Sequence, residues 1–247
     1  MNYGKKIKKE KLPIIILHGW GLRGSTYNKI YQSLKHVGYS VYALDLPGFG
    51  SEPLRKKKMT LDDYVDFVYD FIKSKKFKKI ILIGHSFGGR VSIKFAIAFP
   101  EIVKAMVLTG APGIKQKLSF SKSLFRHVAV IVSEIFRFQA LLPLKYILRK
   151  GLYFIIGEWD YYNAGDLRET FKSVIAEDLS PLLSQVSSST LLVWGNKDTV
   201  VPLDIGISMR DLIPNAKLVV IENQGHKLPY ESPMEFFRPI ISFIEKI

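Results

Sequence analysis

Short apolar runs, most of them closed by a glycine, proline or aspartate, recur along the chain and alternate with helix-like stretches. The runs are rich in isoleucine, leucine and valine, which is typical of strands buried on both faces. Strands that alternate with helices pair in parallel, so the pattern predicts an α/β fold with three layers and a mostly parallel sheet. The six expected strands are Ile14–Leu17, Val41–Leu44, Ile80–Ile83, Ala105–Leu108, Thr190–Trp194 and Lys217–Ile221.

The stretch Leu61–Lys73 has the clearest helical pattern between these strands. Its apolar residues fall on one stripe, with aspartates mostly elsewhere. Thr60 precedes it as a plausible N-cap, and acidic residues in the first turn suit the positive end of a helix.

The alternation stops between Pro112 and about Ser180, where helical patterns and aromatic residues replace strand signals. We interpret 112–180 as a helical cap inserted after the fourth strand, and 1–111 with 181–247 as the core. Its aromatic side chains would line an apolar substrate pocket or form the cap's own core. A few ordinary helices without a lid role are the alternative. The aromatics are Phe120, Phe125, Phe136, Phe138, Tyr146, Tyr153, Phe154, Trp159, Tyr161 and Tyr162.

A G-x-S-x-G motif directly follows the third expected strand and precedes a helical stretch, Arg90–Phe99. This strand–turn–helix context is typical of a nucleophile elbow, in which a strained turn lifts a serine above the sheet. Side chains beside the serine would clash there, so Gly84 and Gly88 are required. The pattern predicts Ser86 as a nucleophile at the positive end of the helix.

A serine nucleophile needs a base and an acid that orients the base. His226 follows the last expected strand, and Asp198 follows Thr190–Trp194. Both therefore lie at the carboxyl edge of the sheet, where parallel α/β folds place their sites. The order Ser86, Asp198, His226 along the chain predicts a catalytic triad. Asp45 competes for the acid because it also ends a strand, although the residues after it suggest a turn.

Four other histidines have simpler expected roles. His18 and His85 flank glycine turns, so we expect them to hydrogen-bond to backbone. His36 and His127 fall in helix-like segments, where surface or packing roles are expected.

The first glycine-rich loop, at 18–24, allows two chemistries. It contains G-x-G-x-x-G, and Asp45 ends the next strand 21 residues after Gly24. This spacing resembles a dinucleotide-binding fingerprint and favours a dehydrogenase when taken alone. In a hydrolase the same loop supplies one backbone N–H of an oxyanion hole, and the residue after the nucleophile supplies the other. We then expect Trp20 and Phe87 in those roles.

Taken together, the motifs identify the chain as a member of the α/β-hydrolase superfamily, and it resembles serine carboxylesterases. The combination of HGWG with G-x-S-x-G is similar to esterases that cleave pimeloyl methyl esters. Ser86 argues against haloalkane dehalogenases and epoxide hydrolases, which use an aspartate at the elbow. Relatives usually begin with a hairpin before the first strand, and we expect that edge to be missing or vestigial here. The motifs are HGWG (18–21), DLPGFGSE (45–52), GHSFGG (84–89), GNKDTVVP (195–202) and QGH (224–226).

Composition excludes some chemistries and sets expectations about partners. With no cysteine, the chain has no thiolate metal site and no cysteine nucleophile, and a reducing cytoplasm is the expected location. No metal-ligand cluster appears, so no metal and no cofactor are expected. The formal net charge of +14 is concentrated in lysine runs at 5–9, 55–58 and 73–79. No nucleic-acid motif accompanies them, so we expect a solvated basic face rather than nucleic-acid binding. No stretch is apolar enough for a transmembrane segment, and nothing predicts an oligomeric state.

These observations predict a hydrolase that cleaves a carboxylic ester or related acyl bond of a small, apolar substrate through an acyl-enzyme. Thioesters, lactones and the carbon–carbon bond of a diketone remain alternatives on the same machinery. A dinucleotide-binding oxidoreductase and a non-catalytic binding protein are the alternatives outside hydrolysis.

Overall fold

The computed structural model describes residues 11–114 and 164–247. A six-stranded sheet lies at the centre of this part, in the order β2-β1-β3-β4-β5-β6, and every neighbouring pair is parallel. Its strands are β1 (Ile14–Leu17), β2 (Val41–Leu44), β3 (Ile80–His85), β4 (Val103–Thr109), β5 (Ser189–Gly195) and β6 (Ala216–Ile221).

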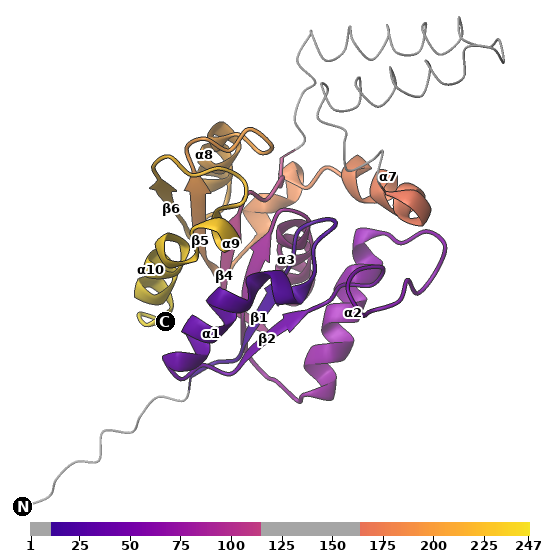
Figure 1. Cartoon of the computed structure of the whole chain (residues 1–247), viewed down its shortest axis with the longest axis horizontal. Coiled ribbons are helices and arrows are strands. Elements are labelled where there is room, and N and C mark those ends of the chain that lie inside the picture. The colour runs from indigo at the N-terminus through magenta and orange to yellow at the C-terminus, as the bar shows by residue number, and fades with distance from the viewer. Residues whose placement is uncertain (1–10, 115–163) are drawn as a thin grey trace, which may run out of the picture.

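Helices cover both faces of the sheet, as Figure 1 shows. The described α-helices are α1 (Asn28–His36), α2 (Leu61–Ser74), α3 (Phe87–Ala98), α7 (Arg168–Ala176), α8 (Leu203–Leu212), α9 (Leu228–Glu231) and α10 (Pro233–Ile244). Three short 3₁₀ helices join them, η1 (Gly24–Tyr27), η3 (Gly165–Leu167) and η4 (Ser180–Gln185).

Alternate residues of each strand pack against opposite helical layers, because successive side chains of a strand point to opposite faces. In β1, Ile15 and Leu17 belong to the core formed with α2, α3 and α8. Ile14 and Ile16 belong to the core formed with α1 and α10. This confirms the predicted fold class, a three-layer α/β structure with a mostly parallel sheet.

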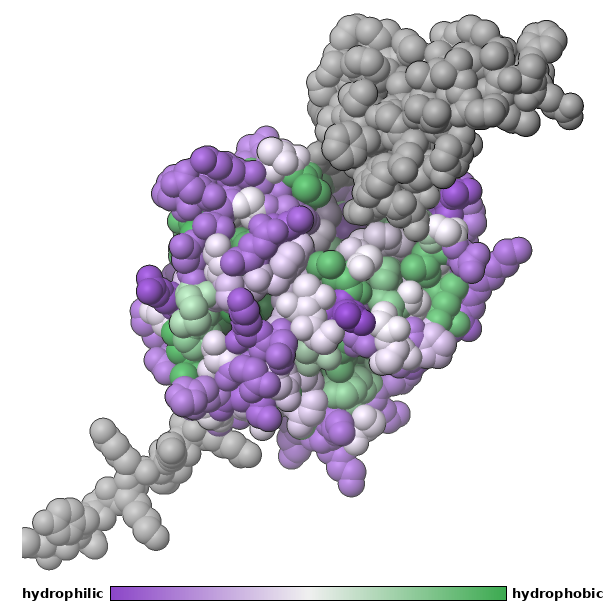
Figure 2. Space-filling view, in the orientation of Figure 1, coloured by the Kyte–Doolittle hydropathy of each residue, from purple (hydrophilic) through white to green (hydrophobic). Residues whose placement is uncertain are grey.

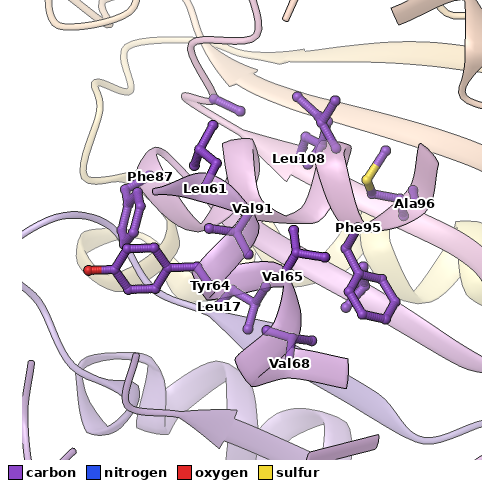
Figure 3. Close-up of a cluster of buried hydrophobic side chains, with 14 of the residues drawn as sticks. Leu17, Leu61, Tyr64, Val65, Val68, Phe87, Val91, Phe95, Ala96 and Leu108 are labelled. Carbon is purple, nitrogen blue, oxygen red and sulfur yellow. The ribbon is translucent and has the colours of Figure 1, made fainter. Parts of the chain in front are cut away.

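Beside the candidate site, helices α2 and α3 pack against each other and form part of one helical layer. Figure 3 shows Tyr64 and Val65 of α2 lying against Phe87 and Val91 of α3. All four side chains are buried, and burying a side chain of this size contributes about 1.5–3 kcal/mol. Thr60 caps α2 as expected, since its hydroxyl accepts from the Asp63 N–H and the Asp63 carboxylate accepts from the Thr60 N–H.

The third strand is longer than the sequence suggested, and this determines where the glycine-rich turn begins. Gly84 and His85 continue β3 and pair with Leu108 and Thr109 of β4. Helix α3 then starts at Phe87 rather than at Arg90. Glycines are poor in both helix and strand propensity, which hid both boundaries.

Most of the expected cap lies outside the described residues, including all ten aromatic residues named for it. The described part of 112–180 contains α7, which packs onto the core. Thr170 accepts a hydrogen bond from the Met59 N–H, and Val174 is buried in the α2–α3 layer. Residues 1–10, which bear on the expected absence of a leading hairpin, also lie outside.

Figure 2 shows hydrophilic side chains over much of the described surface on this face, with small hydrophobic patches between them. No helix in the described part of the chain has the length and apolarity needed to cross a membrane.

Candidate active site

Ser86 occupies a strained turn between β3 and α3. Its backbone has φ 50° and ψ −114°, a conformation that L-residues rarely adopt. The Ser86 N–H donates to the Thr109 carbonyl at 3.0 Å, which ties the turn to the end of β4. Strain of this kind is retained where the surrounding structure enforces it, and it is frequent at active sites.

Close backbone approaches explain the glycines that flank Ser86. A Cβ atom on Gly88 would lie 2.2 Å from the Leu17 carbonyl oxygen, and one on Gly84 would lie 2.5 Å from the Ser92 hydroxyl. The Gly88 N–H donates to the His18 carbonyl at 3.0 Å. The elbow therefore packs directly against the loop that follows β1.

His226 and Asp198 form a hydrogen-bonded pair at the same edge of the sheet. The His226 Nδ1 lies 2.9 Å from Asp198 Oδ2. The other carboxylate oxygen accepts from the N–H groups of Val200 and Val201, at 2.9 and 2.8 Å. With its side chain only 2% exposed and both oxygens occupied, Asp198 holds the imidazole with Nδ1 as the donor, which leaves Nε2 free to accept a proton.

The His226 ring lies close to two residues near Ser86, His85 and Gly110. The ring of His85, the residue before Ser86, lies 4.8 Å from the His226 ring between centroids. Gly110 follows Thr109, whose carbonyl accepts from the Ser86 N–H. A Cβ atom on Gly110 would lie 2.7 Å from the His226 ring. Ser86 and His226 make no hydrogen bond within the described residues. Such contacts often tighten only when substrate binds.

Asp45 has a different position and different partners. Its carboxylate accepts from the Gly24 N–H at 2.7 Å and from the N–H and hydroxyl of Ser51 at 2.8 and 2.9 Å. Partial burial opposes ionisation, but these hydrogen bonds outweigh it and lower the pKa of Asp45. The carboxylate thus closes a turn, as its sequence context suggested. It is already bonded to the last glycine of the G-x-G-x-x-G pattern.

The expected oxyanion donors lie on the two loops that meet at the elbow. Neither the Trp20 N–H nor the Phe87 N–H donates a hydrogen bond to another described residue. The Gly19 carbonyl is held by His18 Nδ1 at 2.8 Å and by the Leu22 N–H at 3.1 Å. Because the C=O and N–H of a trans peptide point in opposite directions, this holds the Trp20 N–H on the other side.

The other histidines in the described part of the chain have the environments that the sequence predicted. His18 and His85 are buried and bond to backbone groups. His36 is exposed on α1, and His127 lies outside the described residues. Burial lowers the pKa of His18 and that of His85, so both stay neutral.

Gly110 and Tyr27 contribute to the site but were not singled out from the sequence. Gly110, with φ +51°, leaves the space that the His226 ring and Asp198 occupy. Its only sequence signal is a glycine directly after a buried strand. The Tyr27 hydroxyl lies 2.6 Å from His85 Nδ1, and no local pattern reports a contact between residues that far apart.

An aromatic cluster borders the loop after β1, which carries the expected oxyanion donor Trp20. The Trp20 ring lies 4.9 Å from Phe49, 5.3 Å from Phe87 and 4.8 Å from Phe171 of α7, between ring centroids. An apolar wall beside Ser86 suits an apolar acyl or alcohol group. Within residues 11–114 and 164–247, no three His, Asp or Glu side chains are placed to hold a metal ion.

Comparison with known proteins gives one family. The family model described as the α/β-hydrolase fold matches residues 13–233. A putative esterase/lipase 2 of Mycoplasma genitalium is 28% identical, over 98% of this chain and 92% of the relative.

A 2-hydroxy-6-oxononadienedioate/2-hydroxy-6-oxononatrienedioate hydrolase of Cupriavidus pinatubonensis is 24% identical, over 94% of this chain and 86% of the relative. Among solved structures, a thermophilic esterase from Thermogutta terrifontis aligns with a TM-score of 0.71 at 22% identity, over 95% of this chain and 90% of that one.

Proposed function

The chain belongs to the α/β-hydrolase family, and from this premise we propose that it is a serine hydrolase that cleaves a carboxylic ester or a related acyl bond. Ser86 is the nucleophile, His226 the base and Asp198 the orienting acid. The observation that carries the proposal is the Asp198–His226 pair beside the strained turn that bears Ser86.

In this mechanism His226 Nε2 takes the Ser86 hydroxyl proton as the serine oxygen attacks the acyl carbonyl. The carbonyl oxygen becomes an oxyanion, which accepts hydrogen bonds from the Trp20 and Phe87 N–H groups. The tetrahedral intermediate collapses, and the alcohol leaves with the proton held by His226. Water then attacks the acyl-enzyme by the same steps in reverse order, releasing the acid and restoring Ser86.

The division into a core of 1–111 and 181–247 and a cap over 112–180 is part of the proposal. It is supported by β4, which leads into the segment at the carboxyl edge of the sheet, and by α7, which lies at the same edge with the Phe171 ring 4.8 Å from the Trp20 ring between centroids. A cap anchored there would exclude water and shape an apolar pocket over Ser86. We further propose that the protein acts without a cofactor. The absence of cysteine fits a cytoplasmic location.

The first test is covalent labelling with a fluorophosphonate, followed by mass spectrometry of the digested protein. The probe should attach at Ser86, and Ser86→Ala should abolish both labelling and turnover of chromogenic esters. A wild-type protein that hydrolyses neither esters nor thioesters and takes no label would overturn the proposal. Varying acyl length in the ester series then defines the preferred acyl group.

Asp198→Asn and Asp45→Asn form a matched pair that tests the assignment of the acid. Asp198→Asn should lower kcat roughly 10³–10⁴-fold, because the amide favours the wrong imidazole tautomer. Asp45→Asn should lower the melting temperature with little change in kcat, since that carboxylate bonds Ser51 of its own turn and the Gly24 N–H but not His226. The opposite pattern would move the acid to Asp45.

Carbon–carbon bond hydrolysis is the second candidate, because a relative is named a 2-hydroxy-6-oxononadienedioate hydrolase. Parallel assays with an ester and with a 2-hydroxy-6-oxo dienoate of similar size distinguish the two. Turnover of the dienoate at a kcat/KM well above that of every ester would favour this candidate.

A further inference from the structure

A buried chain of hydrogen bonds connects the oxyanion loop to the base. The Gly19 N–H donates to the Tyr27 hydroxyl at 3.2 Å, and that hydroxyl lies 2.6 Å from His85 Nδ1. On the other side of the ring, His85 Nε2 lies 2.9 Å from the backbone carbonyl oxygen of His226. Tyr27 and His85 have no role in the proposed chemistry. We call these two side chains the Tyr27–His85 relay.

The direction of every bond in the relay follows from its ends. The His226 carbonyl can only accept, so His85 Nε2 carries the proton and Nδ1 is the acceptor. The Tyr27 hydroxyl therefore donates its single proton to His85 and accepts from the Gly19 N–H. Each group has one consistent role, and the alternative tautomer of His85 would set the bare Nε2 against the His226 carbonyl and leave the Tyr27 proton without His85 as its acceptor.

Burial keeps this arrangement in place. Tyr27 is 1% exposed and His85 is 2% exposed, so water is kept from replacing either partner. Burial lowers the pKa of His85 to about 3 and raises that of Tyr27. Both side chains stay neutral over the pH range of ordinary enzyme assays, and the proton order of the relay does not reverse.

The two ends of the relay are the two groups whose positions the reaction depends on most. Gly19 immediately precedes Trp20, whose N–H is a proposed oxyanion donor. His226 is the proposed base, and its backbone is anchored by His85 while Asp198 anchors its ring. The two loops lie about two hundred residues apart in sequence. A small displacement of a catalytic group can lower the reaction rate by a large factor, so their relative position matters.

We infer that Tyr27 and His85 are positioning residues that hold the oxyanion loop and the base in register with each other. This inference rests on the proposed function. Neither side chain hydrogen-bonds to Ser86 or to the ring of His226. Removing the relay should therefore slow the chemical step while leaving substrate binding nearly unchanged.

Tyr27→Phe is the primary test, because it removes one oxygen and keeps the ring. Losing the hydroxyl frees Gly19 and lets His85 change tautomer. We expect kcat to fall about 10–100-fold, the range known for groups that orient metal-binding histidines, with KM within about twofold. Tyr31→Phe, on α1, is the matched control and should leave both constants unchanged. His85→Gln keeps a donor for the His226 carbonyl and should retain more activity than His85→Leu.

Amide hydrogen exchange provides a readout that does not depend on turnover. In Tyr27→Phe, the peptides covering 18–22 and 223–228 should both exchange faster at temperatures well below melting, while Tyr31→Phe matches the wild type. Unchanged kcat and unchanged exchange in Tyr27→Phe would overturn the relay. A wild type without turnover or serine labelling would instead overturn the proposed function, and exchange at the two loops would still decide whether the relay couples them.

Discussion

Gly110 illustrates, at the scale of single residues, how closely the candidate site is packed. It leaves β4 with φ +51° and adjoins both members of the Asp198–His226 pair. Any side chain there would meet the imidazole at 2.7 Å and the carboxylate at 3.2 Å. His226 is therefore confined by Gly110, by Asp198 and by the His85 bond to its backbone.

Gly110→Ala should accordingly lower kcat by at least about tenfold, because a displaced imidazole can no longer align its Nε2 with the Ser86 hydroxyl. Gly165→Ala is the matched control. Gly165 has a similar φ of +49°, but nothing lies within 4 Å of its Cβ position. Both variants should lose stability from backbone strain, Gly110→Ala more because of the added clash, and only Gly110→Ala should lose activity. Equal kcat in the two variants would show that the clash is absorbed without moving the base.

The neutral, buried His85 should also make stability depend on pH. Burial, followed by the nearby charge that His226 would carry, lowers the pKa of His85 to about 3, against an unfolded value of about 6.5. Above pH ~6.5 neither state binds the proton and the stabilisation is complete. Below that pH only the unfolded state binds it, so the free energy of unfolding falls until about pH 3. The ring also faces Tyr27, Tyr230 and, at longer range, His18.

Urea unfolding of the wild type and His85→Gln at pH 8, 7, 6 and 5 measures this effect. The wild type should lose about 1 kcal/mol more than the variant between pH 6 and 5. Between pH 8 and 7 the two should change in parallel. Parallel curves over the whole range would mean that His85 takes up a proton in the folded state.

At the scale of elements, Arg90 joins α3 to the described parts at both ends of 112–180, the proposed cap. Its guanidinium donates to the Pro112 carbonyl at 2.5 Å, where the segment leaves the sheet. It also donates to the carbonyls of Val174, at 3.0 Å, and Glu177, where α7 ends. A buried cation suits the negative end of a helix. Arg90 of α3 thus hydrogen-bonds to the chain both just after β4, at Pro112, and at the end of α7.

Arg90→Met should lower the free energy of unfolding by about 2–3 kcal/mol, because charged hydrogen bonds are lost and carbonyls are left buried. Lys94→Met, one turn further along α3, removes ion pairs to Asp62 and Glu177, and those carboxylates are 69% and 30% exposed. Pairs of this kind contribute roughly 0–1 kcal/mol. Guanidinium unfolding of the two variants makes the comparison, and similar losses would contradict the special role of Arg90.

At the scale of the whole molecule, the parallel sheet gathers loops from distant parts of the sequence at one edge. The loops after β1, β3, β4, β5 and β6 supply every group of the candidate site. The formal net charge of the whole chain is +14, and the field of such a charge acts over a longer range than any single contact. The field would favour the approach of anionic substrates over neutral ones of the same shape.

A carboxylate-bearing ester and its neutral isostere test this effect of net charge. When NaCl is raised from about 10 to about 500 mM, the Debye length shrinks from roughly 30 Å to a few ångströms. The kcat/KM for the anionic ester should then fall at least about threefold, and that for the isostere should stay level. Equal salt responses would mean that the basic clusters are too far from the site to matter.

Local patterns determined the elements and the edge where the candidate site lies. Buried strands need unbroken apolar runs, so β1 and β2 were predicted with the boundaries that the structure has, and the others within two residues. Loops after parallel strands must emerge at one edge, which placed Ser86, Asp198 and His226 near each other. The glycines at 84 and 88 marked the elbow because the chain passes too close for a side chain there.

Only the tertiary structure shows which of the two acids contacts His226: Asp198 hydrogen-bonds its ring, whereas Asp45 bonds Gly24 and Ser51. Strand order separates them: β5 lies beside β4 and β6, next to the base loop, while β2 lies at the far edge of the described sheet. The same holds for Tyr27, Gly110 and Arg90. Their roles arise from contacts with residues that the fold brings together from distant positions, and hydrophobic periodicity and turn propensity carry no record of such pairings.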